Sequence, residues 1–136
     1  MFTINIWAIV IATIVSFLIS AVWYSSFLFG NDWLTLVKIS ENEVNTMRAA
    51  GMWRSYSIHL LSTLITLFVL AFAMSMIGIH NATDGAFIGF FAWLGFIAPS
   101  GVLDYLWRKT PMRLILIDSV CVLLSLVISG AILAAW

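Results

Sequence analysis

Four long stretches of almost uninterrupted apolar residues alternate with shorter, more polar segments along the chain. A helix needs about 20 mostly apolar residues to cross the hydrocarbon layer of a membrane. The stretches that meet this length cover residues 5–24, 55–77, 85–107 and 112–136. The pattern therefore predicts an all-α membrane protein, a single integral membrane domain over residues 1–136 with four transmembrane helices in an antiparallel bundle.

Residues that start or stop helices stand near the ends of these stretches. Gly78 is placed to end the second helix, and Thr83 or Asp84 to cap the third. Thr110 and Pro111 fit a cap followed by proline at the first position of the fourth helix. These signals favour separate helices joined by short turns.

The segment 25–54 is the one sizeable stretch between spans. Its first half is too apolar for a free loop, which predicts a short helix lying in the membrane interface. Ser40 and Glu43 have the spacing of a capping box, so a second short helix is expected to run to Ala50 and end at Gly51. Asp32, in the apolar half, is expected to be solvated.

Composition supports the membrane assignment. Hydrophobic residues make up 63% of the chain and charged residues 9%, against about 45–50% and 25% in soluble domains. The net charge is zero and there is one cysteine, Cys121. These values argue against disorder, a coiled coil, a nucleic-acid binder and a secreted disulfide scaffold.

The basic residues give an orientation. All six lie in or beside two loops, 25–54 and 108–111. The positive-inside rule places both loops in the cytoplasm and both termini outside. The first 24 residues carry no charge, so they lack the basic region of a cleaved signal peptide, and we expect the first span to be retained.

Small residues recur at helical spacing and predict close helix packing. They lie on the first span and at the start of the third: Ala8, Ala12, Ser16, Ser20, Gly85 and Gly89. The sequence leaves open whether these faces meet within one chain or between chains. Pro99 predicts either a kink in the third span or a local unwinding that lines a cavity.

One histidine and two aspartates fall within the predicted spans: His59, Asp104 and Asp118. Each lies about 6–8 Å inward from a basic residue at the same membrane face, so they form one candidate polar layer. Such residues usually face the interior of a bundle and pair with another group. One interpretation is a structural lock, in which Asp104 pairs with Arg108 and Asp118 bonds His59 or a basic loop residue.

Two other interpretations of this layer stay open. It could carry protons or a small solute through titration of Asp118 and His59, or hold a metal with one histidine and two carboxylates. No local metal-ligand spacing supports the last, so we expect no metal. Haem ligation by His59 and His80 would need the two histidines close together, but they are predicted at opposite membrane faces. Motifs for nucleophilic or phosphate chemistry are also missing, so we expect no catalytic residues and no cofactor.

A string of aromatic and small residues follows the first span: Trp23, Tyr24, Ser25, Leu28, Phe29, Gly30 and Trp33. With an N-terminal span before it, this string resembles the small bacterial membrane-protein family catalogued as domain of unknown function 1761. The resemblance implies a four-helix protein of the bacterial inner membrane and carries no activity. In physical terms Trp23, Tyr24, Phe29, Gly30 and Trp33 form an interfacial motif, which either anchors the chain as it turns back to the membrane or presents a lipid or partner surface.

Two functions remain. The first is a non-enzymatic membrane module that associates with itself or with a membrane-protein partner in the lipid bilayer, without nucleic acid. The second is a small proton-linked transporter or channel.

Overall fold

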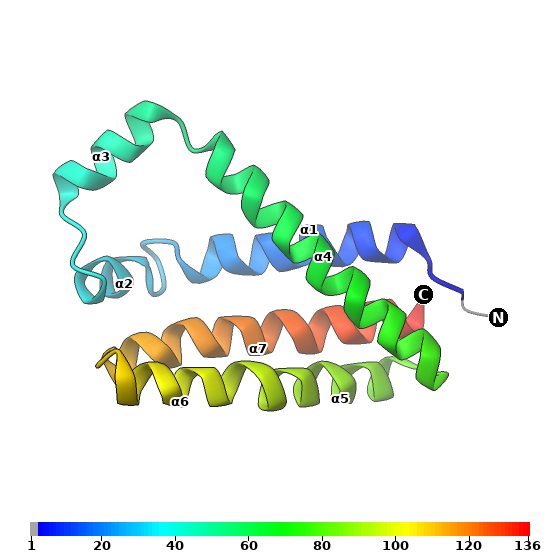
Figure 1. Ribbon diagram of the computed structural model, residues 1–136. Coiled ribbons are helices and arrows are strands. Elements are labelled where there is room, and N and C mark those ends of the chain that lie inside the picture. Colours follow the sequence, from blue (N-terminus) through cyan, green and yellow to red (C-terminus); the bar gives the residue numbers. More distant parts are fainter. Residues whose placement is uncertain (1–2) are drawn as a thin grey trace.

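A computed structural model describes residues 3–136, and within that range the chain is helical with no strand (Figure 1). Its elements are α1 (Ile6–Trp23), α2 (Gly30–Leu36), α3 (Glu41–Ala50), α4 (Trp53–Ile77), α5 (Ala82–Ala92), the π-helical turn η1 (Trp93–Ile97), α6 (Ala98–Trp107) and α7 (Met112–Ala135).

Four spans are long and apolar enough to cross a membrane: α1, α4, the continuous run Ala82–Trp107 and α7. Their ends lie within three residues of the predicted ones, because the length of each apolar run sets the length of its helix. The prediction of an all-α membrane protein with four spans is confirmed. Two short helices, α2 and α3, occupy the segment between the first two spans; placement of either in the membrane interface stays a prediction.

Most of the predicted helix ends are confirmed. Gly78 ends α4 with a left-handed backbone at φ 80°, a conformation that costs glycine little. Ser40 and Glu43 form the capping box of α3, and Gly51 follows its last residue, Ala50.

Two predicted caps are wrong. Asn81 caps α5 by accepting a hydrogen bond from the backbone N–H of Asp84, in place of Thr83 or Asp84. Pro111, with ψ at 134°, is itself the N-cap of α7 in place of Thr110, although the helix starts at Met112, the first residue of the predicted span. A residue with ψ this extended cannot be the first helical residue.

Helix α7 is the centre of the molecule and packs against both α1 and α5. Figure 1 shows α1, α7 and the α5–α6 run aligned, with α7 running in the direction opposite to the other two. Helix α4 crosses them obliquely, so its beginning and α3 diverge from the aligned helices. The buried core lies where α4 crosses α1, around Ile9, Ala12, Leu67, Leu70 and Met74.

The small-residue faces meet within the chain. Ala8, Ala12 and Ser16 of α1 are buried, and the hydroxyl of Ser16 lies 2.8 Å from that of Ser129 in α7. Ser20, half-buried, lies with its oxygen 3.8 Å from the sulfur of Cys121. The question that the sequence left open is therefore answered for α1: its small face packs against the chain's own core.

Helices α5 and α7 approach most closely at glycines. A Cβ at Gly85 would collide with the carbonyl oxygen of Gly130, and one at Gly89 would lie 2.7 Å from the carbonyl carbon of Leu126. Any residue with a Cβ at these positions would force the two backbones apart, so their close approach requires glycine.

The local unwinding that was one of the two predictions for Pro99 is not found, because the third span stays helical from Ala82 to Trp107. Residues Trp93–Ile97 form a π-helical turn, and α6 continues directly from it with Pro99 in its first turn. Proline has no backbone N–H to donate. Its position needs none, because the π turn has already changed the hydrogen-bonding register of the helix. Helix α6 makes far less contact with α7 than α5 does, so the span diverges from α7 beyond the π turn.

Candidate functional site

The last turn of α1 bonds consecutive residues of α7 at the basic end of the bundle, defined here as the end where α1 finishes and α7 begins. The indole N–H of Trp23 donates to the carbonyl oxygen of Ile117 over 2.9 Å. The hydroxyl of Tyr24 donates to Oδ1 of Asp118 over 2.7 Å. A hydrogen bond to a carboxylate is stronger than one between neutral groups, so Tyr24 fixes the position of the Asp118 side chain.

The rest of the interfacial motif holds α2 against this turn. The ring of Trp33 meets that of Tyr24 edge-on with centroids 5.8 Å apart. The ring centroids of Phe29 and Trp23 are 4.7 Å apart. Gly30 is buried against the turn itself, since a Cβ there would come within 2.8 Å of the carbonyl of Ser25. All five residues of the motif thus gather around one turn.

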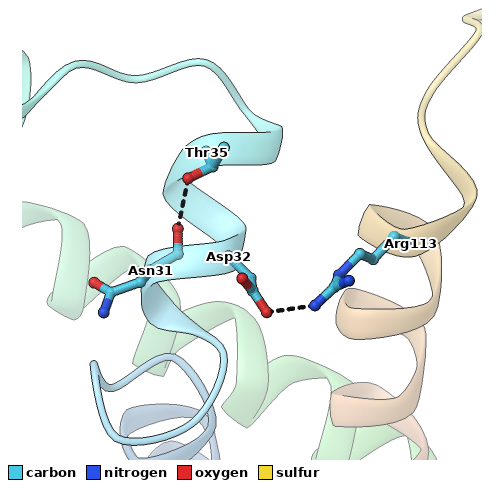
Figure 2. Close-up of polar contacts among 4 residues, drawn as sticks. All are labelled: Asn31, Asp32, Thr35 and Arg113. Atoms are coloured by element: carbon cyan, nitrogen blue, oxygen red, sulfur yellow. Dashed lines mark hydrogen bonds and ion pairs between the residues drawn. The ribbon is translucent and has the colours of Figure 1, made fainter.

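An ion pair fastens α2 to α7 from the other side. Nη2 of Arg113 donates to Oδ2 of Asp32 over 2.7 Å, and Figure 2 shows the two side chains reaching across from their helices. The expectation that Asp32 is merely solvated is therefore wrong. The arginine and aspartate side chains are 68% and 47% exposed, so the pair is screened by water and contributes modestly.

A groove of about 210 Å³ lies between α6 and α7 near the same end. It exists because the third span diverges from α7 beyond the π turn. Its lining combines apolar side chains with carboxylates and hydroxyls: Phe96, Ile97, Ser100, Gly101, Asp104, Thr110, Ile115, Asp118, Ser119 and Val122. Asp104 and Asp118 are both half-buried in it.

Only two of the three predicted polar-layer residues come together. Asp104 pairs with Arg108 at 3.4 Å, which confirms that part of the predicted lock. The partner of Asp118 is Tyr24, so the predicted pairing with His59 or a basic loop residue is wrong. His59 is exposed and does not line the groove; its ring meets Phe17 of α1 edge-on at 5.7 Å. His59 lies near the beginning of α4, the part of that helix that diverges from the aligned helices.

Helical spacing indicates only one of the other polar residues of the groove. Ser100 falls one helical turn before Asp104 on the same face. Ser119 carries no such signal, and it is located by tertiary packing, because the indole N–H of Trp93 donates to its carbonyl oxygen over 2.8 Å. That bond ties the π turn to α7 at the groove.

The chemistry available at this site is acceptance of hydrogen bonds and of positive charge. Two carboxylates and three hydroxyls line the groove, and residues 3–136 contain no cluster of three or more histidine, cysteine or acidic side chains able to hold a metal. The groove is therefore suited to a cationic hydrogen-bond donor.

Comparison with known proteins gives a family but no activity. No curated protein and no solved structure matches the chain. The model of one family, described as a protein of unknown function (DUF1761), matches residues 7–134, a stretch that includes the interfacial motif and all but the end residues of the first and last spans. The chain belongs to that family.

Proposed function

We propose that this multi-pass protein is a non-enzymatic membrane module that associates with a second copy of itself through helix α4. The observation that carries the proposal is a row of polar side chains that stay exposed on a span. His59, Ser62 and Thr66 lie on one side of α4 and are all exposed. His59 lies six residues after Trp53, about 9 Å into the span.

Polar groups at this depth normally face protein, because lipid offers them no hydrogen bonds. Within residues 3–136 the side chains of His59 and Ser62 have no hydrogen-bond partner, and the Thr66 hydroxyl bonds its own helix at the carbonyl of Ser62. The buried positions of α4 are few: Leu67, Leu70 and Met74. A partner helix on the polar face would supply the missing contacts.

A second copy is the occupant we favour, because an isologous contact around a two-fold axis would place the same residues of both copies together. Ser62 would then face its counterpart, and a small residue at that point permits close approach. The small residues of α1 and α5 are already used inside the chain, whereas Ser62 of α4 is exposed.

Absence of a catalytic step is part of the proposal. The thiol of Cys121 is buried beside Ser20, and no basic side chain contacts it within the described part of the chain. A thiol needs such a neighbour to become a nucleophile near neutral pH.

Cross-linking in membranes tests the contact. Ser62→Cys in a Cys121→Ser background is expected to form a disulfide-linked dimer rapidly on oxidation, because a disulfide requires Cα atoms within about 7 Å. The matched control is Gly95→Cys, at an exposed position of the third span where a side chain would meet nothing within 4 Å. Equal, slow cross-linking of both variants would refute self-association through α4.

A second candidate, a small proton-linked transporter or channel, is favoured by one observation: the Asp118 carboxylate faces a groove within the span. Proteoliposomes containing a pH-sensitive dye and a potassium gradient would then acidify faster with the protein than without it, and Asp118→Asn would remove the difference. Proton entry equal to that of empty liposomes would dismiss this function.

We also propose a location and an orientation, the inner membrane of a bacterium with both termini outside. The support is the position of all six basic residues at one end of the four spans. Enzymatic labelling of a tag after Trp136 in intact cells and in inverted vesicles would test it; labelling only in inverted vesicles would overturn the orientation.

A further inference from the structure

The groove between α6 and α7 has two chemically different parts. Phe96, Ile97, Ile115 and Val122 give it apolar walls, while the carboxylates of Asp104 and Asp118 give it negative charge. Its volume of about 210 Å³ is more than ten times the roughly 10–15 Å³ that a single buried water needs. An occupant with an apolar portion and a polar portion fits both parts.

The negative charge of the groove is only partly balanced by the protein. Oδ1 of Asp104 lies 3.4 Å from Nε of Arg108 and is paired with its charge. Asp118 instead accepts a hydrogen bond from the neutral hydroxyl of Tyr24. Arg113, in the first turn of α7, is engaged by Asp32. No basic side chain within residues 3–136 pairs with Asp118, so the groove as a whole is complementary to a cation.

The depth of the groove brings it within reach of phospholipid headgroups. Helix α7 has 24 residues and so spans about 36 Å, some 6 Å more than the hydrocarbon layer. Asp118 lies six residues from its start, about 9 Å inward, and Asp104 and Thr110 lie nearer the membrane face. Lipid is the solvent at this level, with headgroups at the mouth of the groove and acyl chains along its walls.

Among common headgroups, charge and hydrogen bonding select one. Phosphatidylglycerol brings a net negative charge that the aspartates repel. Choline carries a positive charge but has no N–H to donate. The primary ammonium of ethanolamine has three donors, as lysine does, and Asp104, Asp118 and the hydroxyl oxygens of Ser100, Thr110 and Ser119 are acceptors around it.

We propose that this groove is a binding site for phosphatidylethanolamine, with the ammonium between Asp104 and Asp118 and an acyl chain along Phe96, Ile97 and Val122. The proposal goes beyond self-association and does not depend on it, because the groove lies between α6 and α7 and the polar face lies on α4. One lipid per chain is expected.

Native mass spectrometry from lipid nanodiscs tests this site. The nanodiscs contain equal amounts of phosphatidylethanolamine, phosphatidylcholine and phosphatidylglycerol with the same acyl chains. We expect phosphatidylethanolamine to be retained about tenfold over phosphatidylcholine, the factor that one hydrogen bond to a charged group supplies. Stepwise N-methylation of the ethanolamine lipid should reduce retention progressively, a series that needs no protein variant.

Variants locate the site. Asp118→Asn and Asp104→Asn are expected to bring retention of the two zwitterionic lipids close to parity. Asp84→Asn, the same change at the opposite end of the third span, should leave the preference intact. Equal retention by the wild-type protein, a preference for phosphatidylglycerol, or an unchanged preference in both groove variants would overturn the proposal. Displacement of the lipid by free ethanolamine at millimolar concentration would assign the groove to a soluble amine instead.

Discussion

Replacing Gly89 with alanine tests the close contact on which the bundle depends. The new Cβ would lie 2.7 Å from the carbonyl carbon of Leu126 and 3.1 Å from Cα of Val127. The carbonyl oxygen of Leu126 would lie closer still, and ordinary contact begins at 3.4 Å, so α5 and α7 must separate by more than about 0.7 Å at this point. The opposing atoms belong to the backbone of α7 and cannot rotate away.

Two energies of opposite sign decide the outcome. Overpacking a well-packed site costs about 1–3 kcal/mol, and the upper end applies here because backbone must move. Alanine recovers about 0.8–1.0 kcal/mol in helix propensity over glycine. The net expectation for Gly89→Ala is a loss of about 2 kcal/mol in the free energy of unfolding.

The matched control is Gly95→Ala on the same span. A Cβ there meets nothing within 4 Å, so only the propensity gain remains and the variant should be up to about 1 kcal/mol more stable than wild type. Reversible unfolding by sodium dodecyl sulfate in mixed micelles, followed by tryptophan fluorescence, measures both. Finding Gly89→Ala as stable as Gly95→Ala would refute the glycine-mediated contact.

Three further changes probe the basic end and the core. Tyr24→Phe removes the hydrogen bond to Asp118 and should cost about 1–3 kcal/mol in thermal or detergent unfolding, whereas Tyr105→Phe, at an exposed ring, should cost almost nothing; equal effects would count against the Tyr24–Asp118 bond. A double-mutant cycle on Asp32 and Arg113 should give a coupling free energy of about 0.2–1 kcal/mol that falls with added salt. A coupling free energy above about 2 kcal/mol would mean that the pair is shielded from water. The same cycle on Ser16 and Ser129, buried with oxygens 2.8 Å apart, should give about 0.6 kcal/mol, and no coupling would show that the two hydroxyls do not bond.

The spans were predictable from sequence because the hydropathy of each helix is a property of its own residues and does not depend on the other helices. A run of some 20 apolar residues determines that a helix crosses the membrane, whatever its neighbours are. Caps such as Ser40 and Gly78 are local for the same reason. The π turn at Trp93–Ile97 was not predictable, since Pro99 is compatible with a kink, an unwinding or a change of helical register.

The candidate site was only half predictable, because its partners come from different helices. Asp104 and Arg108 are one turn apart, so their pairing follows from helical spacing alone. The bond from Tyr24 to Asp118 depends on how α1 packs on α7, and a phenol is not an obvious partner for a carboxylate in a sequence that also offers histidine and arginine. The distance of His59 from the groove depends on the tilt of α4. The residue periodicity of a single helix does not determine that tilt.

The copy number of the protein in its own membrane is the most direct test of self-association. Single-molecule photobleaching of a fluorescent fusion, reconstituted at low density from native membrane vesicles, counts the chains in each complex. The account predicts two bleaching steps for wild type and a shift toward one step for Ser62→Phe, with Gly95→Phe unchanged. One step for the wild-type protein across a range of densities would contradict it.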